Sequence, residues 1–124
     1  MIEAERQMKN NEAGYKVVYP DGYVSWSPKE VFEKAYMQVG SNNTITQTNV
    51  DRFIKETEIL TLGDKTTVVK ATLANDFVIV ESSSCVDPAN YDEALGADIC
   101  LGRIKSLVWN LLGFLLQTAK CGIK

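Results

Sequence analysis

The sequence predicts an α+β fold in which antiparallel β-hairpins decorate one long C-terminal helix. Residues 15–26 and 66–82 each hold two strand-like segments around turn residues, a pattern typical of hairpins. Residues 88–119 carry apolar side chains at helical spacing. The 124 residues are 45% hydrophobic and 23% charged, within the globular range. We expect an N-terminal hairpin-plus-helix lobe over residues 1–45 and a hairpin and long-helix domain over residues 46–124, packed as one unit.

The N-terminal lobe begins with residues 2–11, which are predicted to form a short polar helix ended by two asparagines. Residues 15–19 and 23–26 alternate in polarity as two strands. Pro20-Asp21-Gly22 lies between them and predicts the connecting turn.

Two N-cap patterns predict helices in the middle of the chain. Ser27 and Glu30 have the spacing of a capping box, with proline between them at the favoured first position, so a helix should run to about residue 38. Thr48 is predicted to cap a second helix, which ends at Leu62-Gly63-Asp64 and turns inward Val50, Phe53, Ile54 and Ile59.

The second hairpin has the clearest strand pattern. Residues 66–73 are rich in β-branched side chains, and residues 77–82 are predicted to pair back onto them. Asn75 and Asp76 form the turn, since both residues tolerate the left-handed backbone that a tight hairpin needs.

The C-terminal helix is predicted to start at Asp87-Pro88, or after Asn90 as a cap for Glu93, and to run to about Ala119. It would then be roughly 40 Å long. Its apolar arc covers roughly 200°, against about 100° for an ordinary surface helix. The centre of the arc holds Leu101, Ile104, Val108, Leu111 and Leu115, and its flanks hold Leu107, Trp109, Leu112, Phe114 and Leu116. One hairpin cannot cover this arc, so we expect a homo-oligomer through the helix.

The composition excludes several classes of site and partner. The chain has no histidine, which removes histidine-dependent nucleophiles and ordinary His/Cys zinc sites. A net charge of −3 disfavours binding to a nucleic-acid polymer. Arg103, Lys105 and Asn110 interrupt the apolar helix, so we expect no membrane span. Three cysteines without paired spacing, and no secretion signal, predict reduced thiols in the cytoplasm.

The sequence predicts no catalytic residues, no metal site and no cofactor. Asp92, Glu93 and Asp98 lie in the first turns of the long helix, where carboxylates favour the helix dipole. Arg103 heads a narrow polar stripe on that helix. The stripe is either a solvated face, a close helix contact at Gly102 and Gly113, or a phosphate contact. Tyr91 and Phe77 lie beside turns and could stack on a base.

Residues 67–116 resemble a family of small proteins from tailed phages and prophages. The matching features are the hairpin pattern Leu73-x-x-x-Phe77-x-x-x-Glu81-Ser82, the corner Cys85-Val86-x-Pro88-x-Asn90-Tyr91-Asp92, Gly96, and the helix end Leu112-Gly113-Phe114-Leu115-Leu116. Within that grouping the chain is most similar to the Thoeris anti-defence sponge proteins of the first described type. In Thoeris immunity, a TIR protein of the infected bacterium makes a cyclic ADP-ribose isomer that activates an NAD-depleting effector.

The resemblance implies a phage protein that holds this signal in the host bacterial cytoplasm without cleaving it. It also implies an oligomer whose ligand pockets are shared between protomers. On this basis Arg103 is expected to bind phosphate, and Asn90 a phosphate or a ribose hydroxyl. Phe77 and Tyr91 are expected to contact the adenine, and Lys70 to add positive charge.

Three alternatives remain open at the level of sequence. The protein could hold other cyclic nucleotides, such as the cyclic di- or trinucleotides of CBASS immunity. It could inhibit a host defence protein by direct contact through its tyrosine- and tryptophan-rich hairpin. It could also degrade the signal as an enzyme, which the lack of histidine and of an acid/base constellation disfavours.

Overall fold

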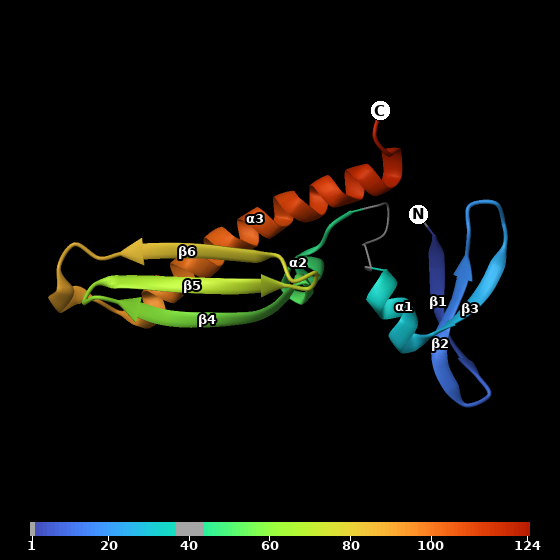
Figure 1. The fold of residues 1–124 in the computed structure, drawn as a ribbon, viewed down its shortest axis with the longest axis horizontal. Coiled ribbons are helices and arrows are strands. Elements are labelled where there is room, and N and C mark those ends of the chain that lie inside the picture. The colour runs from blue at the N-terminus through green and yellow to red at the C-terminus, as the bar shows by residue number, and fades with distance from the viewer. Residues whose placement is uncertain (1, 37–43) are drawn as a thin grey trace. The chain divides into compact units, whose positions relative to one another are not determined.

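The computed structural model describes residues 2–36 and 44–124. Contacts divide these residues into two compact units, one formed by 2–36 with 118–124 and the other by 44–117. The fold class is α+β as predicted, because each unit contains a three-stranded antiparallel sheet and the second also contains most of a long C-terminal helix (Figure 1). The predicted division into residues 1–45 and 46–124 stays a prediction.

The first unit is a three-stranded sheet, in the order β1-β2-β3, followed by a short helix. Its elements are β1 (Glu3–Lys9), β2 (Glu12–Val18), β3 (Val24–Pro28) and α1 (Lys29–Ala35). The hairpin predicted from residues 15–26 is confirmed as β2 and β3.

The helix predicted over residues 2–11 is wrong, because residues 3–9 form the edge strand β1. Asn10 and Asn11 both have positive φ angles, 51° and 64°. Two consecutive left-handed residues make the two-residue turn that matches the twist of a hairpin. β1 then pairs with β2 along its whole length, so strand pairing outweighs its helix-favouring composition.

The cap predicted at Ser27 is also wrong. α1 begins one residue later, with Pro28 in the cap position and no side chain accepting from the free amides. The Ser27 hydroxyl donates to the Pro28 carbonyl instead. α1 ends at Ala35, and the N–H of the cap residue Tyr36 donates to the Phe32 carbonyl. The predicted extension to residue 38 falls outside the described residues.

The second unit has a sheet in the order β4-β5-β6, flanked by helices. Its elements are α2 (Gln47–Phe53), β4 (Ile54–Leu62), β5 (Thr66–Leu73), β6 (Val78–Ser84), the 3-10 helix η2 (Pro88–Asn90) and α3 (Glu93–Cys121), whose last turn belongs to the first unit. The two predicted strands of residues 66–82 are confirmed, and Asp76 in their turn has φ 68° as expected.

The helix predicted from Thr48 to beyond Ile59 is only partly right. Thr46 caps α2 rather than Thr48: its side chain accepts from the Asn49 amide, and the Asn49 side chain accepts from the Thr46 amide. α2 ends at Phe53, and Ile59 lies in β4, where alternate β-branched residues pair with β5. Residues 62–64, predicted to end the helix, lie instead at the β4–β5 turn.

α3 crosses one face of the sheet (Figure 1). Alternate residues of β5 point toward it and are buried, namely Thr67, Val69, Ala71 and Leu73. The buried residues on α3 are Gly96, Ala97, Cys100, Ile104, Val108 and Leu112. This stripe is narrower than the predicted arc and displaced from its centre, because Leu111 and Leu115 stay exposed.

The start of α3 differs from both predicted starts. Asp87 accepts from the Ala89 amide and begins only the short η2 helix. Asp92, rather than Asn90, caps α3, since its carboxylate accepts from the amides of Ala94 and Leu95. The predicted end near Ala119 is close to the observed end at Cys121.

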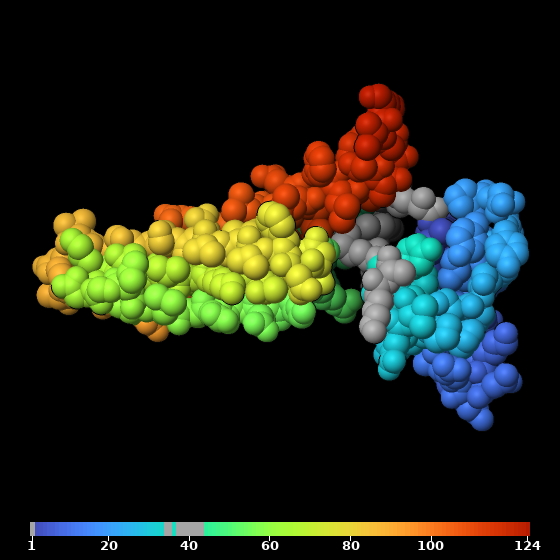
Figure 2. Space-filling view, viewed as in Figure 1, coloured from blue at the N-terminus to red at the C-terminus, as the bar shows by residue number. Residues whose placement is uncertain are grey.

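Two apolar surfaces of the second unit are uncovered within the described residues. One is the outer side of α3, with Leu107, Trp109, Leu111, Phe114 and Leu115 exposed and Phe114 at 74%. The other is the sheet face turned away from α3, which Figure 2 shows open to the viewer and which presents Leu60, Leu62, Val78 and Val80. Oligomerisation through the helix stays a prediction that this exposure favours.

α3 is long and apolar enough to cross a membrane by length and composition, with a mean hydropathy of 1.5 over an 18-residue window of which 22% is buried. The core helix of a soluble protein can meet the same criteria. The expectation of no membrane span therefore stays a prediction.

Candidate functional site

The corner between β6 and α3 is held in shape by its own polar side chains. The Cys85 amide donates to the Lys65 carbonyl, which ties the corner to the start of β5. The Cys85 thiol donates to the Asp87 carbonyl, and Asp87 and Asp92 each cap the turn that follows them. The corner residue Asn90 lies exposed at the end of η2, directly before Tyr91.

Tyr91 fixes the start of α3 to the sheet. Its hydroxyl lies 2.7 Å from the hydroxyl of Thr61 on β4 and 2.7 Å from the hydroxyl of Thr67 on β5. The Thr61 hydroxyl also donates to the carboxylate of Glu93 in the first turn of α3. Tyr91 was expected to contact adenine, and any such contact has to use its ring, because these threonines engage its hydroxyl.

Gly96 lets α3 approach the sheet closely at the same place. A Cβ atom at this position would lie 2.2 Å from the Thr67 hydroxyl oxygen and 2.8 Å from the Thr67 Cβ. Real side chains do not approach this closely, so any larger residue would push the helix off β5. The glycine thus positions the first turns of α3, with the corner residues, against the strands.

Arg103 lies exposed on α3 with its side chain directed to the edge strand. Its Nη1 donates to the Ser82 carbonyl of β6 over 2.8 Å. A guanidinium has five N–H donors, so four remain after this bond. The arrangement holds the cation in one place while leaving donors for a second acceptor.

The Cys100 thiol, one turn before Arg103, is buried against the Thr67 carbonyl. Burial raises its pKa, the nearby Arg103 charge opposes this, and Glu81 adds to it. The thiol therefore stays protonated near neutral pH and acts as a small apolar side chain rather than as a nucleophile.

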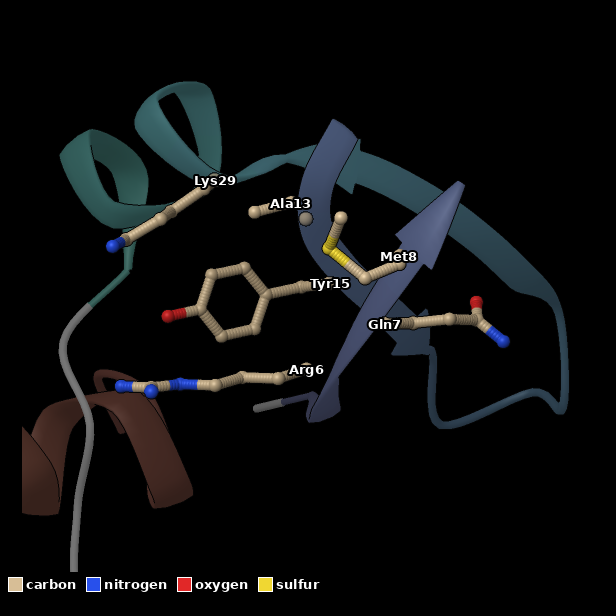
Figure 3. A pocket seen from close by; sticks show the side chains of 7 residues that line it. Arg6, Gln7, Met8, Ala13, Tyr15 and Lys29 are labelled. Atoms are coloured by element: carbon tan, nitrogen blue, oxygen red, sulfur yellow. The ribbon is translucent and has the colours of Figure 1, made fainter. Parts of the chain in front are cut away.

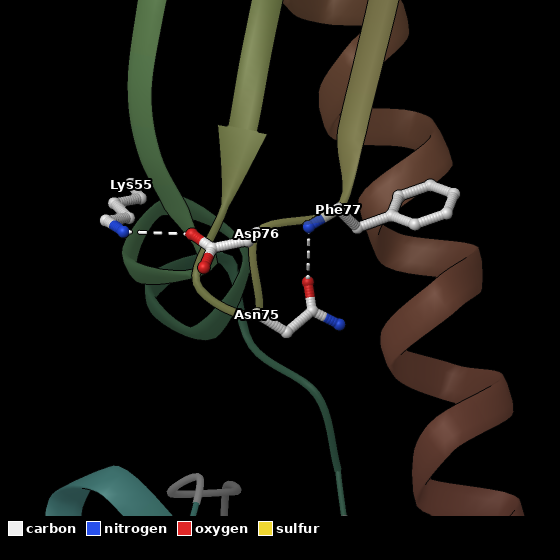
Figure 4. Close-up of polar contacts among 4 residues, drawn as sticks. All are labelled: Lys55, Asn75, Asp76 and Phe77. Carbon is white, nitrogen blue, oxygen red and sulfur yellow. Dashed lines mark hydrogen bonds and ion pairs between the residues drawn. The ribbon is translucent and has the colours of Figure 1, made fainter.

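Phe77 lies at the far end of the sheet from Tyr91. It follows the β5–β6 turn, where its carbonyl accepts from the Leu73 amide, and its side chain is 55% exposed. Figure 4 shows the ring projecting from the turn on the side opposite Lys55. Thr67, bonded to Tyr91, and Leu73 are the second and last residues of β5, which separates them by about 20 Å at ~3.3 Å per residue.

Lys70 lies on the other face of the sheet from α3. It belongs to the alternate set of β5 residues, paired with Glu58 on β4 and Val80 on β6. Side chains directly opposite each other share a face, so Lys70 projects away from Arg103 and Tyr91.

The structure therefore brings together only Asn90 and Tyr91 among the five predicted binding residues. Tyr91 reaches β4 and β5, whereas Arg103 reaches β6, and α3 passes between them over Thr67. A helix with its side chains is about 10 Å across, so the two groups lie on opposite flanks of it.

Sequence reasoning missed the polar cluster of Thr61, Thr67, Tyr91 and Glu93. The threonines read only as β-branched strand residues, and the partners lie 24 to 32 positions apart in the chain. Alternation along β5 could have placed Thr67 on the buried face with Val69, where a hydroxyl needs a partner.

Among residues 2–36 and 44–124, no group of three or more acidic or cysteine side chains is arranged to hold a metal ion. The carboxylates of the corner instead accept hydrogen bonds from amides and hydroxyls.

In a comparison with known proteins, most of the second unit matches one protein family. No curated protein and no solved structure matches the chain. Residues 45–120, more than half of the sequence, match one described family, and this range contains the three strands of the second sheet, the corner and nearly all of α3. The chain belongs to the phage protein (N4 Gp49/phage Sf6 gene 66) family.

Proposed function

We propose that this phage-family protein binds a cyclic ADP-ribose isomer, the Thoeris immune messenger, and sequesters it in the host cytoplasm without cleaving it. The family match supports only that this is a phage-family protein. The resemblance of the corner and helix to the Thoeris anti-defence sponges supports binding and sequestration of the messenger. A sponge acts by stoichiometry and slow release, so it needs a preorganised site rather than catalytic groups.

The observation that carries the proposal is the environment of the Arg103 side chain. Its guanidinium is exposed to solvent, yet held in place by the Ser82 carbonyl. Four N–H donors remain for the bidentate, charge-assisted bonds that a phosphate accepts. Because the side chain is already oriented, less conformational entropy is lost when the ligand binds.

The positions of the other proposed ligand residues favour a pocket shared between protomers. Asn90 and Tyr91 lie on one flank of α3, Arg103 on the other, Phe77 at the opposite end of the sheet and Lys70 on its outer face. One protomer cannot place all five against a single small molecule. The uncovered apolar surfaces of α3 and of the sheet provide the area by which copies of the chain could associate.

The direct test is isothermal titration of the purified protein with the product of an activated Thoeris TIR enzyme. Arg103→Ala should weaken binding by about ten- to a hundredfold, since a hydrogen bond to a charged group contributes about 1.5–3 kcal/mol. Arg103→Lys should recover part of the loss, because it keeps the charge without the planar fork. Lys120→Ala, which removes one positive charge elsewhere on α3, is the matched control and should bind like the wild type. Unchanged affinity in Arg103→Ala would contradict the proposal.

Mixing two variants with weakened binding tests whether the pocket is shared. If Arg103 and Phe77 meet in one pocket across an interface, co-folded Arg103→Ala and Phe77→Ala chains should regain some intact sites. Each variant alone should have none. Mixed oligomers that bind no more ligand than the single variants would show that each pocket lies within one chain.

The alternatives give different results in the same assays. A sponge for other cyclic nucleotides would bind a cyclic di- or trinucleotide that displaces, or replaces, the Thoeris messenger. A direct inhibitor would bind a host defence protein and show no heat on titration with the messenger. An enzyme would return altered ligand after denaturation.

A further inference from the structure

The first unit contains a hollow formed by its sheet and its helix. It has a volume of about 220 Å3, and we call it the N-terminal hollow. The residues that line it are Arg6, Gln7, Met8, Ala13, Gly14, Tyr15 and Lys29 (Figure 3). This volume is below the range of about 300–1,000 Å3 typical of drug-sized ligands, so it suits one ring system and its substituent.

The strand register brings four of the lining side chains together. Arg6 on β1 is directly opposite Tyr15 on β2, and Met8 is directly opposite Ala13. Residues two apart on a strand share a face, so these four side chains form two adjacent rows on one face of the sheet. Lys29, the first residue of α1, closes the hollow from the helix.

Tyr15 supplies an aromatic surface held rigidly from behind. One face of its ring stacks on Phe32, with ring centroids 4.2 Å apart and planes inclined by 25°. Its hydroxyl donates to Glu33 over 2.8 Å, which fixes the position of the far end of the ring. Because Phe32 covers one face, the hollow lies against the remaining face and edges of the ring.

Two cations flank this ring. Figure 3 shows the Arg6 and Lys29 side chains on either side of Tyr15, with both charged ends near its hydroxyl and Met8 and Ala13 at the other end of the ring. Within the described residues neither cation forms an ion pair. With the Glu33 carboxylate beside the Tyr15 hydroxyl, the three charged groups sum to one net positive charge.

We propose that the N-terminal hollow binds a planar aromatic ring that carries an anionic group, the chemistry of a nucleoside monophosphate. The ring stacks on Tyr15 against the apolar wall of Met8 and Ala13. The anion takes charge-assisted hydrogen bonds from Arg6 and Lys29. The hollow is lined only by residues of the first unit and uses none of the residues proposed to bind the messenger.

The test uses the full-length protein, isotope-labelled and titrated by NMR with AMP, with adenosine and with ribose 5-phosphate. AMP should shift amides of β1, β2 and α1 and bind more tightly than either part alone. Arg6→Gln and Lys29→Gln should each weaken AMP binding by about tenfold or more. Tyr15→Leu should weaken it by about fivefold to a hundredfold through lost stacking. Added salt should weaken AMP more than adenosine.

Two matched control variants show whether AMP binds in the N-terminal hollow itself. Lys16→Gln removes a positive charge next to Tyr15 in the sequence. The Lys16 side chain lies on the face of β2 opposite the hollow, so this variant should leave AMP binding unchanged. Arg103→Ala should also leave it unchanged. Full AMP affinity in Arg6→Gln, loss of AMP binding in Arg103→Ala, or equal affinity for ribose 5-phosphate and AMP would each overturn the proposal, as would no AMP binding at millimolar concentration.

Discussion

Replacing Gly96 by alanine tests how closely α3 lies on the sheet. The added methyl carbon would lie 2.2 Å from the Thr67 hydroxyl oxygen, and Thr67 is fully buried. Overpacking of this kind costs about 1–3 kcal/mol. Moving Thr67 would also strain its hydrogen bond to Tyr91, which contributes about 1 kcal/mol. The better helix propensity of alanine returns up to about 1 kcal/mol, so we expect a net loss of about 2 kcal/mol.

Thermal and urea unfolding followed by circular dichroism measure this loss. For a unit of this size, 2 kcal/mol corresponds to a decrease in Tm of about 10 °C. Wild type and variant must be compared at one protein concentration, because association would make Tm depend on it. The variant should lose less stability in a Thr67→Ala background, since the nearest atom of the clash is then absent.

Two glycines of the same helix are matched controls. A Cβ atom at Gly102 or Gly113 would meet no atom within 4 Å. Alanine at either position should stabilise the protein by about 0.5–1 kcal/mol through lower backbone entropy in the unfolded chain. If Gly96→Ala stabilises the protein in the same way, the close approach of α3 to β5 is refuted.

Three further changes test other contacts. Gly14→Ala should destabilise the first unit by about 1–3 kcal/mol, with a change in fluorescence, because the new Cβ would lie 2.3 Å from the Trp26 ring; a wild-type melt would contradict this packing. Tyr91→Phe should lower the free energy of unfolding by about 1 kcal/mol in urea titrations, since it removes the hydroxyl between two threonines, and an unchanged midpoint would count against that cluster. The hydrogen bond from Gln47, and also a nearby lysine, lower the pKa of Asp51. The wild type should therefore be more stable than Asp51→Asn above pH 3.8, and this difference in stability should fade as the pH falls below that value. A difference in stability that grows in acid would contradict the lowered pKa.

The second hairpin and the long helix could be read from sequence because their local patterns agree with their tertiary roles. β5 is rich in β-branched residues and has a turn that tolerates Asp76 at positive φ, and both features favour the structure it adopts. α3 combines helical spacing with carboxylates near its start. The errors there were the choice of cap and the centre of the buried stripe on α3, since Leu111 and Leu115 stay exposed.

The two failed helix predictions have one cause. Residues 3–9 favour a helix by composition, and residues 54–62 follow an apolar helical pattern, yet both form edge strands. Each edge strand gains its stability from pairing with the strand that follows it, and the residue pattern of the edge strand alone does not show this pairing. In β1 the left-handed Asn10-Asn11 turn was the informative feature.

The predicted binding residues could be named from resemblance but not assembled. Their spacing in sequence does not show that Lys70 projects from the outer face of the sheet, or that α3 separates Tyr91 from Arg103. Those facts follow from strand register and from the position of Gly96 on Thr67. Because these positions keep the five residues apart within one chain, they lead to the testable hypothesis of a site between protomers.

The central claim is tested most directly by a filtration and release experiment. The purified protein is incubated with the product of an activated Thoeris TIR enzyme, removed by filtration, and the filtrate is assayed for effector activation. The retained protein is then heated and its supernatant assayed in the same way. Sequestration predicts that activity disappears from the filtrate and returns on heating, in proportion to the amount of protein added. Undiminished activity in the first filtrate would contradict binding, and activity that is lost and never returns would contradict storage without cleavage.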